Sequence, residues 1–123
     1  IFPSHPVLLH NEVILVEGIF DALNLIDKGL PNVVCCFGTN NFNEHKLSLL
    51  KVYGVEGVHV FFDGDDAGQN AAEKVCNMCN DIGMPNDVIP IAKGTDPGDL
   101  TPERVTDLRE FLYGQRSPGG ESA

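Results

Sequence analysis

The sequence predicts an α/β fold in which a mainly parallel sheet of about four strands is flanked by helices. Two observations predict it. Short, nearly continuous apolar runs alternate along the chain with longer segments of helical periodicity. Such apolar runs are typical of parallel strands that are covered on both faces. Regular alternation of strand and helix then implies right-handed crossover connections within one sheet.

Each predicted element has its own signal in the sequence. Glycines at the ends of three predicted helices fit C-terminal stops. Thr101 fits the N-cap of the last helix, with Pro102 in its first turn. Pro90 indicates that the last strand lies at an edge of the sheet. The predicted strands are residues 12–17, 32–38, 57–63 and 87–91, and the predicted helices are residues 20–29, 43–54, 67–83 and 101–114.

Apolar spacing also predicts which side chains of the first two helices face the core. The predicted buried residues are Phe20, Ala22, Leu23, Leu25 and Ile26 in the first helix, and Leu47, Leu50 and Val52 in the second.

The four cysteines are interpreted as reduced thiols. Cys35 and Cys36 are adjacent in a strand and should point to opposite faces of the sheet, which argues against a shared metal. Cys76 and Cys79 have a metal-like spacing within a helical pattern, but no second pair of matching form accompanies them. Their role stays open at this point.

The chain of 123 residues fits one domain. We expect an N-terminal lead-in over residues 1–11, the folded domain over residues 12–114 and a flexible tail over residues 115–123. No apolar run is long enough to span a membrane, and no signal-peptide pattern precedes the first strand. Because the first residue is Ile, we interpret the chain as a cytoplasmic fragment of a longer protein.

The charge of the chain argues against a strong grip on nucleic acid by this fragment itself. The formal net charge is −10, and only 8 residues are Lys or Arg. Proteins that bind nucleic acid through its phosphates normally present a basic face. An acidic chain can still act on nucleic acid if its carboxylates hold a divalent metal and a neighbouring domain supplies the basic surface.

Acidic residues follow three of the four predicted strands. Glu17 ends the first strand, the run Asp63-Gly64-Asp65-Asp66 ends the third, and Asp96 and Asp99 follow the fourth. Parallel strands end along one edge of the sheet, where ligands of such folds bind. Like charges gathered there oppose ionisation, and a hard divalent cation removes that cost. The pattern therefore predicts a metal site suited to phosphoryl or nucleotidyl transfer.

Several of these residues have simpler interpretations. Asp66 is expected to cap the following helix, and Asp21, one turn after Glu17, could be an exposed helix acid. Lys93 could contact a phosphate or be a solvated loop lysine. Thr39 could position a phosphate or only begin the next helix. His45 and His59 have no acid partner at a useful spacing, so they are assigned no role.

Four ordered motifs resemble those of Toprim domains, as found in bacterial DnaG-type primases and phage primase–helicases. The resemblance covers about residues 12–100. The segment from Val16 to Leu23 (VEGIFDAL) resembles the first Toprim motif, and the segment from Phe62 to Ala72 (FDGDDAGQNAA) resembles the second. The segments 36–39 (CFGT) and 93–99 (KGTDPGD) are similar to the Gly-Thr turn and the G-x-D-P element of the primases.

The resemblance implies a compact, Rossmann-like Toprim fold and a metal-dependent primase, which makes RNA primers in DNA replication by nucleotidyl transfer. It implies catalytic roles for Glu17, Asp63 and Asp65. It also implies Mg²⁺ or Mn²⁺ as the cofactor. The implied metal ligands are Glu17, Asp21, Asp63, Asp65 and Asp96, and the implied phosphate-binding or nucleotide-binding residues are Gly18, Gly38, Thr39 and Lys93.

The implied partners are nucleotides, a single-stranded DNA template held by other domains of the parent protein, and a replicative helicase. No association with a membrane is expected. One departure concerns the last motif. Primases often carry Asp-Pro-Asp-Glu where this chain has Asp96-Pro97-Gly98-Asp99, so Asp99 is a weaker candidate than Asp96. We expect the isolated chain to bind metal without synthesising primers.

Other classes of function stay open. A Toprim phosphodiesterase of the nuclease or topoisomerase type would use the same carboxylates to cut nucleic acid. A haloacid-dehalogenase-like phosphatase is echoed by FFDGDDAG, but its nucleophile should lie on the first strand, where this chain has Glu17. A non-catalytic docking module would carry the acids only as a charged surface.

Overall fold

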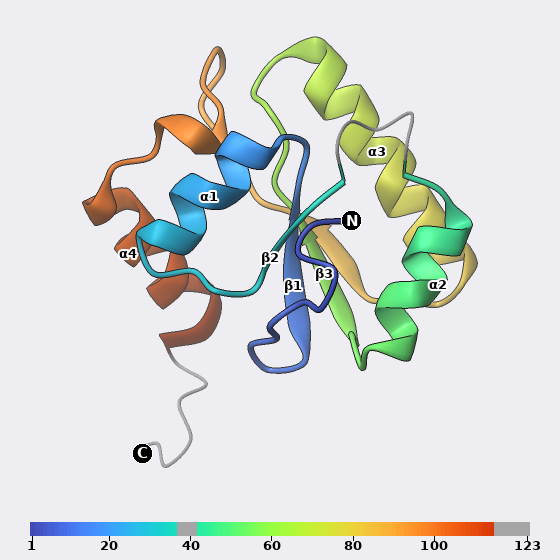
Figure 1. Ribbon diagram of the computed structural model, residues 1–123. Coiled ribbons are helices and arrows are strands. Elements are labelled where there is room, and N and C mark those ends of the chain that lie inside the picture. Colours follow the sequence, from blue (N-terminus) through green and yellow to red (C-terminus); the bar gives the residue numbers. More distant parts are fainter. Residues whose placement is uncertain (37–41, 115–123) are drawn as a thin grey trace.

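The computed structural model describes residues 1–36 and 42–114 and contains four strands and four α-helices in alternating order (Figure 1). A short 3₁₀ helix, η2, precedes the last α-helix. The elements are β1 (Glu12–Val16), α1 (Ile19–Asp27), β2 (Val33–Cys35), α2 (Glu44–Val52), β3 (Gly57–Val60), α3 (Asp66–Asp81), β4 (Asn86–Val88), η2 (Pro97–Asp99) and α4 (Pro102–Tyr113).

The four strands form one parallel sheet in the order β2-β1-β3-β4. This arrangement confirms the predicted α/β class and the edge position of the last strand. The strands are shorter than predicted, because regular pairing stops before the residues that turn towards the helices. Single backbone hydrogen bonds extend the strand pairing beyond these ends. Phe61 N donates to Leu15 O at 2.8 Å, and Ile89 N donates to Val60 O at 2.9 Å.

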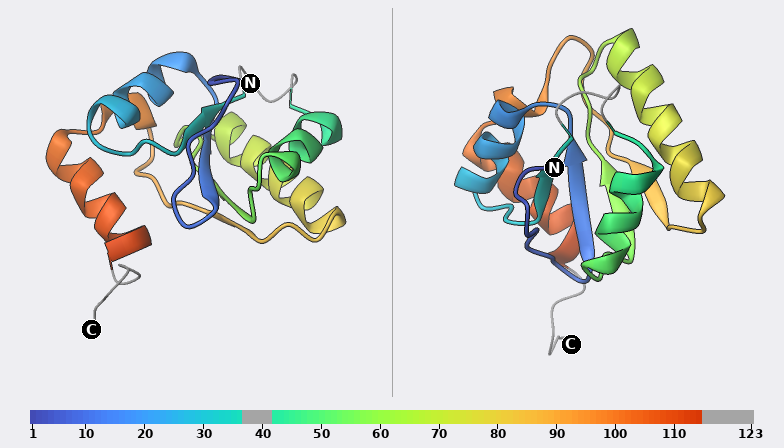
Figure 2. Two further views of the ribbon diagram at one scale, coloured as in Figure 1. Left: turned by 60° about the horizontal axis from the view of Figure 1, so that its bottom comes forward. Right: turned by 45° about the vertical axis from the view of Figure 1, so that its right-hand side comes forward.

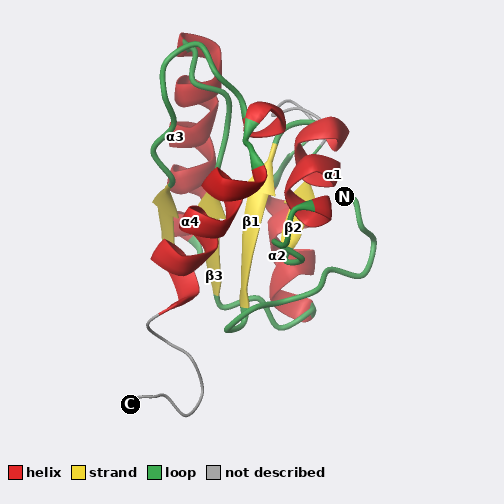
Figure 3. Ribbon diagram, turned by 90° about the vertical axis from the view of Figure 1, so that its left-hand side faces the viewer, coloured by secondary structure: helices red, strands yellow, loops and turns green. Residues whose placement is uncertain are grey.

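Helices cover both faces of the sheet, so the central strands are buried on both sides. Figures 1 and 2 show α1 and α4 on one face and α2 and α3 on the other, and Figure 3 shows the strands between the helices. Side chains of β1 alternate between two apolar clusters, since Val13 and Leu15 pack towards α2 and α3 while Ile14 and Val16 pack towards α1 and α4.

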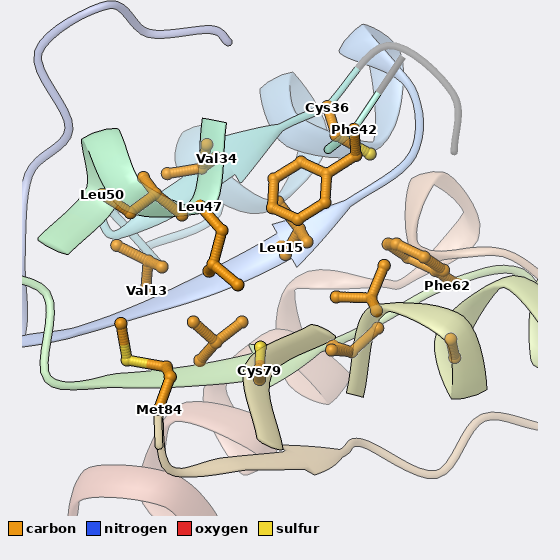
Figure 4. Close-up of a cluster of buried hydrophobic side chains, with 14 of the residues drawn as sticks. Val13, Leu15, Val34, Cys36, Phe42, Leu47, Leu50, Phe62, Cys79 and Met84 are labelled. Carbon is orange, nitrogen blue, oxygen red and sulfur yellow. The ribbon is translucent and has the colours of Figure 1, made fainter. Parts of the chain in front are cut away.

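The larger cluster fills the space between the sheet, α2 and α3. Figure 4 shows Leu15 of β1 in this cluster together with Leu47 of α2 and Cys79 of α3. Cys36 lies in it as well, whereas Cys35 lies in the cluster on the other face, as the strand periodicity predicted.

Three of the predicted buried positions are wrong. Phe20 is 80% exposed, Leu23 is 46% exposed and Val52 is 79% exposed. A helix advances by about 100° per residue, so the face of α1 that contains Ala22 and Leu25 turns Phe20 away from the sheet. Val52 is turned away from the core of α2 in the same manner. Apolar side chains were present on both sides of these helices, and only one side meets the sheet.

The ends of the elements follow the predicted signals closely. Gly29, Gly54 and Gly83 follow α1, α2 and α3 with φ angles of 114°, 94° and 72°, as C-terminal stops require. The Thr101 side chain caps α4 by accepting a hydrogen bond from Arg104 N, and Pro102 opens the helix.

The N-terminal segment is joined to the sheet. Phe2 forms an antiparallel bridge with Cys35 along the outer side of β2, and Leu9 bridges Glu12. Among the residues that the structure describes, no helix combines the length and apolarity needed to cross a lipid bilayer.

Candidate metal centre

The connections that follow β1, β3 and β4 lie at the same end of the sheet (Figure 1). Asp21 lies on α1, Asp63 follows β3, and Asp96 is the N-cap of η2. One carboxylate oxygen from each of the three residues lies within 4.8 Å of those of the other two. All three side chains are half-buried. Parallel topology has thus gathered acids from three distant parts of the chain.

Gly64 explains how the segment after β4 reaches Asp63. Gly64 N donates to Thr95 O at 2.8 Å, and Gly94 N donates to Gly64 O at 2.8 Å. A Cβ atom at position 64 would lie 2.3 Å from Ala92 O, which is closer than any side chain allows. The absence of a side chain therefore lets the segment 92–95 pack against the end of β3, and Asp96 follows directly.

The acids are held in place by backbone N–H groups. Asp21 accepts hydrogen bonds from Gly98 N at 2.9 Å and from Gly18 N at 3.3 Å. Glu17 Oε1 accepts one from Asp63 N at 3.1 Å, so the side chain at the end of β1 contacts the residue at the end of β3. Glu17 and Asp63 are therefore neighbours, as the sequence predicted.

The charges of these acids are not neutralised by any cationic side chain that the structure describes. Within residues 1–36 and 42–114, no Lys, Arg or His forms an ion pair with the acids of this centre. Burial, followed by the charges of Glu17, Asp21, Asp96 and Asp65, raises the pKa of Asp63 to about 6. Burial and the charge of Asp96 raise the pKa of Asp21, while its bonds from Gly98 and Gly18 oppose the rise.

The residues present fit a hard divalent cation. The donors are carboxylate oxygens, which Mg²⁺ and Mn²⁺ prefer. Asp63 Oδ1 is buried and accepts no hydrogen bond from the described residues, so a ligand atom is available that they do not use. Asp21, Asp63 and Asp96 could thus hold one ion between them.

Asp65 lies beside this group in a different role from the three acids. Its Oδ1 accepts a hydrogen bond from Gly68 N at 2.6 Å and forms the N-cap of α3. The expectation that Asp66 caps this helix is therefore wrong by one residue, because α3 begins at Asp66 itself. Asp65 still contributes negative charge to Asp63, and its catalytic role stays a prediction.

The remaining candidates contribute less to the described geometry. Gly18 contacts the site through its N–H group, as noted above. Lys93 is exposed and forms no ion pair in the described part of the chain. Gly38 and Thr39 lie outside the described residues, so their predicted phosphate contacts stay predictions.

Two contacting residues were missed by the sequence analysis. Gly98 binds Asp21, and Asn24 donates from its side chain to Pro97 O at 2.9 Å. Asn24 lies three residues after Asp21, a spacing that puts both on one helix face, and this was the only signal available for it.

Cys76 and Cys79 lie in the second half of α3, away from the acids at its amino-terminal end, whereas Cys35 Sγ donates to the backbone carbonyl of Glu17 at 3.4 Å. Burial and the neighbouring Cys76 raise the pKa of Cys79 to about 11, and burial and Asp87 raise the pKa of Cys76. Both are free thiols, and no metal-binding group with a cysteine is found among the described residues. The interpretation as neutral thiols fits these surroundings.

Relatives of the chain are DNA primases. The chain is 34% identical over 112 residues to the DNA primase of Chlamydia trachomatis, which covers 90% of this chain and 19% of that protein. It is 39% identical over 101 residues to the DNA primase of Borreliella burgdorferi, covering 81% of this chain and 19% of that protein. The chain thus spans about a fifth of the length of these relatives.

Solved structures agree with this similarity. The Aquifex aeolicus primase, comprising zinc-binding and RNA polymerase domains, matches with a TM-score of 0.74 and 30% identity over 85% of this chain and 26% of that one. A DnaG primase catalytic domain bound to single-stranded DNA matches with a TM-score of 0.70 and 25% identity over 85% of this chain and 33% of that one. A family model described as Toprim-like matches residues 14–101, which contain the acids of the centre, and the chain therefore belongs to the Toprim-like family.

Proposed function

We propose that this chain is the metal-dependent centre of a DNA primase, which joins nucleotides into RNA primers during replication. One observation carries the proposal. Three carboxylates from separate segments lie within 4.8 Å of one another, and none of them forms an ion pair with a described cationic side chain. The motif order and the similarity to DNA primases support it. Mg²⁺ or Mn²⁺ is the proposed cofactor.

In this proposal Asp21, Asp63 and Asp96 hold the cation, with Glu17 and Asp65 beside them. The bound cation would screen the triphosphate and favour ionisation of the attacking hydroxyl. Glu17 accepts the Asp63 N–H and so fixes the ends of β1 and β3 relative to each other. It is also the proposed acid or base closest to the three ligands.

Phosphate contacts are proposed for four residues outside the group of three acids. Lys93 is the proposed counter-charge for a nucleotide phosphate, and the N–H of Gly18 is already directed into the site through its bond to Asp21. Gly38 and Thr39, which lie outside the described residues, complete the proposed set.

The partners follow from charge and from length. With a net charge of −10, the chain needs basic surface from elsewhere to hold a single-stranded DNA template. Since relatives are about five times longer, other parts of the parent protein are the proposed source of that surface. A replicative helicase is the proposed protein partner, and the cytoplasm, where bacterial DNA is replicated, is the proposed location.

The test is template-dependent primer synthesis by the full-length parent protein. Asp63→Asn and Asp21→Asn are each expected to lower synthesis by at least about a hundredfold, because each removes one charged ligand. Asp81→Asn, an exposed acid at the far end of α3, is the matched control and should retain activity. Full synthesis by both site variants, or cleavage of DNA or RNA by the wild type without nucleotide incorporation, would contradict the proposal.

A further inference from the structure

The short helix η2 is attached to α1 by a side chain that is not a candidate ligand. Asn24 Nδ2 donates hydrogen bonds to Pro97 O at 2.9 Å and to Leu100 O at 3.2 Å. These two carbonyl groups flank the η2 turn, which begins directly after Asp96. Figures 1 and 2 show η2 beside α1. Asn24 therefore binds the segment that carries one of the three acids to the helix that carries another.

Gly98 makes the second attachment. Its N–H donates to Asp21 Oδ1 at 2.9 Å, so the η2 backbone contacts an acid of the centre directly. A Cβ atom at position 98 would lie 3.0 Å from Asp21 Oδ1 and 3.0 Å from Asp96 Oδ1. A Cβ atom there would be in tight contact with both carboxylates, which would have to shift to accommodate it.

Backbone conformation does not explain this glycine. The glycines with φ in the left-handed region are Gly29, Gly54, Gly83 and Gly94, and Gly98 is not among them. An L-residue could adopt the backbone angles at position 98 without the strain expected in that region. The feature of this position is its tight packing against Asp21 and Asp96, which would have to shift to admit a Cβ atom.

The two attachments oppose an electrostatic force. Carboxylate oxygens of Asp21 and Asp96 lie within 4.8 Å of each other, so the two side chains repel each other when both are ionised. Uncharged donors, namely the Gly98 N–H and the Asn24 amide, hold the two segments together against this repulsion. They do so without placing a cationic side chain between the acids, which leaves the space free for a metal ion.

We infer that Gly98 and Asn24 form a clamp that sets the separation of Asp21 and Asp96 before the ion binds, and that both are positioning residues of the centre. This inference rests on the proposed function, since it assigns the clamp to the same metal site. Neither residue is a ligand: Gly98 has no side chain, and the Asn24 amide is directed at carbonyl groups of η2. Their effect is on the arrangement of the ligands.

The test is Mn²⁺ binding by the 123-residue chain, followed by electron paramagnetic resonance of free Mn²⁺. Gly98→Ala and Asn24→Ala are each expected to weaken binding by about tenfold or more, the loss seen when groups that orient metal ligands are removed. Because both variants disturb one separation, the double variant should lose less than the product of the two single losses. Thermal unfolding of each variant reports whether it is folded.

Two control variants isolate the clamp. Gly114→Ala makes the same chemical change in a helical backbone, where the nearest side chain, Glu110, can move aside. Lys28→Ala removes the contact between Lys28 Nζ and Asn24 Oδ1. It leaves the hydrogen bonds from the Asn24 amide to η2 intact. Both controls should bind Mn²⁺ as the wild type does.

The outcomes separate the clamp from the proposed function. Wild-type binding that Asp63→Asn abolishes, with Gly98→Ala and Asn24→Ala both within twofold of the wild type, would overturn the clamp and leave the metal centre standing. No Mn²⁺ binding by the wild type would overturn both. If Gly98→Ala fails to fold, Asn24→Ala against Lys28→Ala decides the question, because equal affinities in that pair overturn the clamp.

Discussion

The acids at the two ends of the sheet differ in their partners. At the amino-terminal end, His59 lies between two carboxylates, with Nε2 2.7 Å from Glu12 Oε1 and Nδ1 2.6 Å from Asp87 Oδ1. At the carboxyl-terminal end, Asp21, Asp63 and Asp96 converge, and none forms an ion pair with a described cationic side chain. The chain therefore supplies a partner for acids at one end and leaves those at the other end to repel.

The difference separates structural acids from binding acids. Glu12, His59 and Asp87 lie on β1, β3 and β4, and in its doubly protonated form the imidazole donates to both carboxylates. This contact joins three adjacent strands. The described part of the chain offers the acids at the other end no such partner, and Asp63 Oδ1 has no hydrogen-bond donor among the described residues. A bound cation would make their convergence favourable.

The sharpest test of the comparison removes one charge from each end. Asp63→Asn is expected to lower Mn²⁺ affinity by at least about a hundredfold and to raise the melting temperature of the metal-free protein at pH 7, because repulsion is relieved. Glu12→Gln should leave Mn²⁺ affinity unchanged and lower the melting temperature. Equal effects of the two variants on either measurement would contradict the distinction between the ends.

A second test moves the acids apart without changing any charge. Gly64→Ala would place the new Cβ atom 2.3 Å from Ala92 O, a backbone atom that cannot rotate away. We expect a loss of about 3 kcal/mol in unfolding free energy, together with weaker Mn²⁺ binding, because Asp96 follows the displaced segment. Gly114→Ala is the control. Wild-type affinity in a folded Gly64→Ala protein would show that this close packing does not position Asp96.

These contacts also explain how far the sequence could predict the molecule. The alternation of strand and helix depends on local patterns, and it predicted the sheet and the end at which the acids gather. The pattern could not predict which side of α1 meets the sheet, so Phe20 was placed in the core. It could not show that Asp65 rather than Asp66 caps α3, because the two aspartates are adjacent and the helix begins at the second of them.

Long-range partners were the least predictable part. His59 has no acid partner at a useful spacing in the sequence, but Glu12 and Asp87, which lie 47 and 28 residues away, meet it through strand pairing. The same limit applies to Asn24 and Gly98, which contact η2 and Asp21 across more than 70 residues. Neither contact leaves a trace in local periodicity.

A third test removes the partner that the amino-terminal end has. His59→Gln is expected to lower the unfolding free energy by about 2 kcal/mol, since two carboxylates lose their imidazole partner and Glu12 is largely buried. Mn²⁺ binding at the opposite end should not change. The Asp87 side chain is 60% exposed, so Asp87→Asn should lower the unfolding free energy less than His59→Gln does when both are measured by chemical denaturation. A larger loss for Asp87→Asn would contradict the importance of the buried contact.

The smallest expected effect is a pH dependence that comes from the carboxyl-terminal end alone. The pKa of Asp63 is raised from 3.8 to about 6, so between these values the folded protein binds a proton that the unfolded chain has released. The contribution of Asp63 to the stability of the metal-free protein is therefore present below about pH 4 and is lost as the pH rises through about 6. Denaturant unfolding between pH 4 and pH 7 measures it.

Asp63→Asn should flatten this slope, whereas Asp81→Asn should leave it as in the wild type. Mn²⁺ should reverse the slope, because the ion binds the ionised carboxylate and competes with the proton, so its apparent affinity should rise with pH up to about 6 and level off above. A slope that survives in Asp63→Asn, or Mn²⁺ affinity that is constant from pH 4 to pH 7, would mean that the repulsion at this end is already balanced within the protein. The two ends of the sheet would then differ in geometry but not in charge.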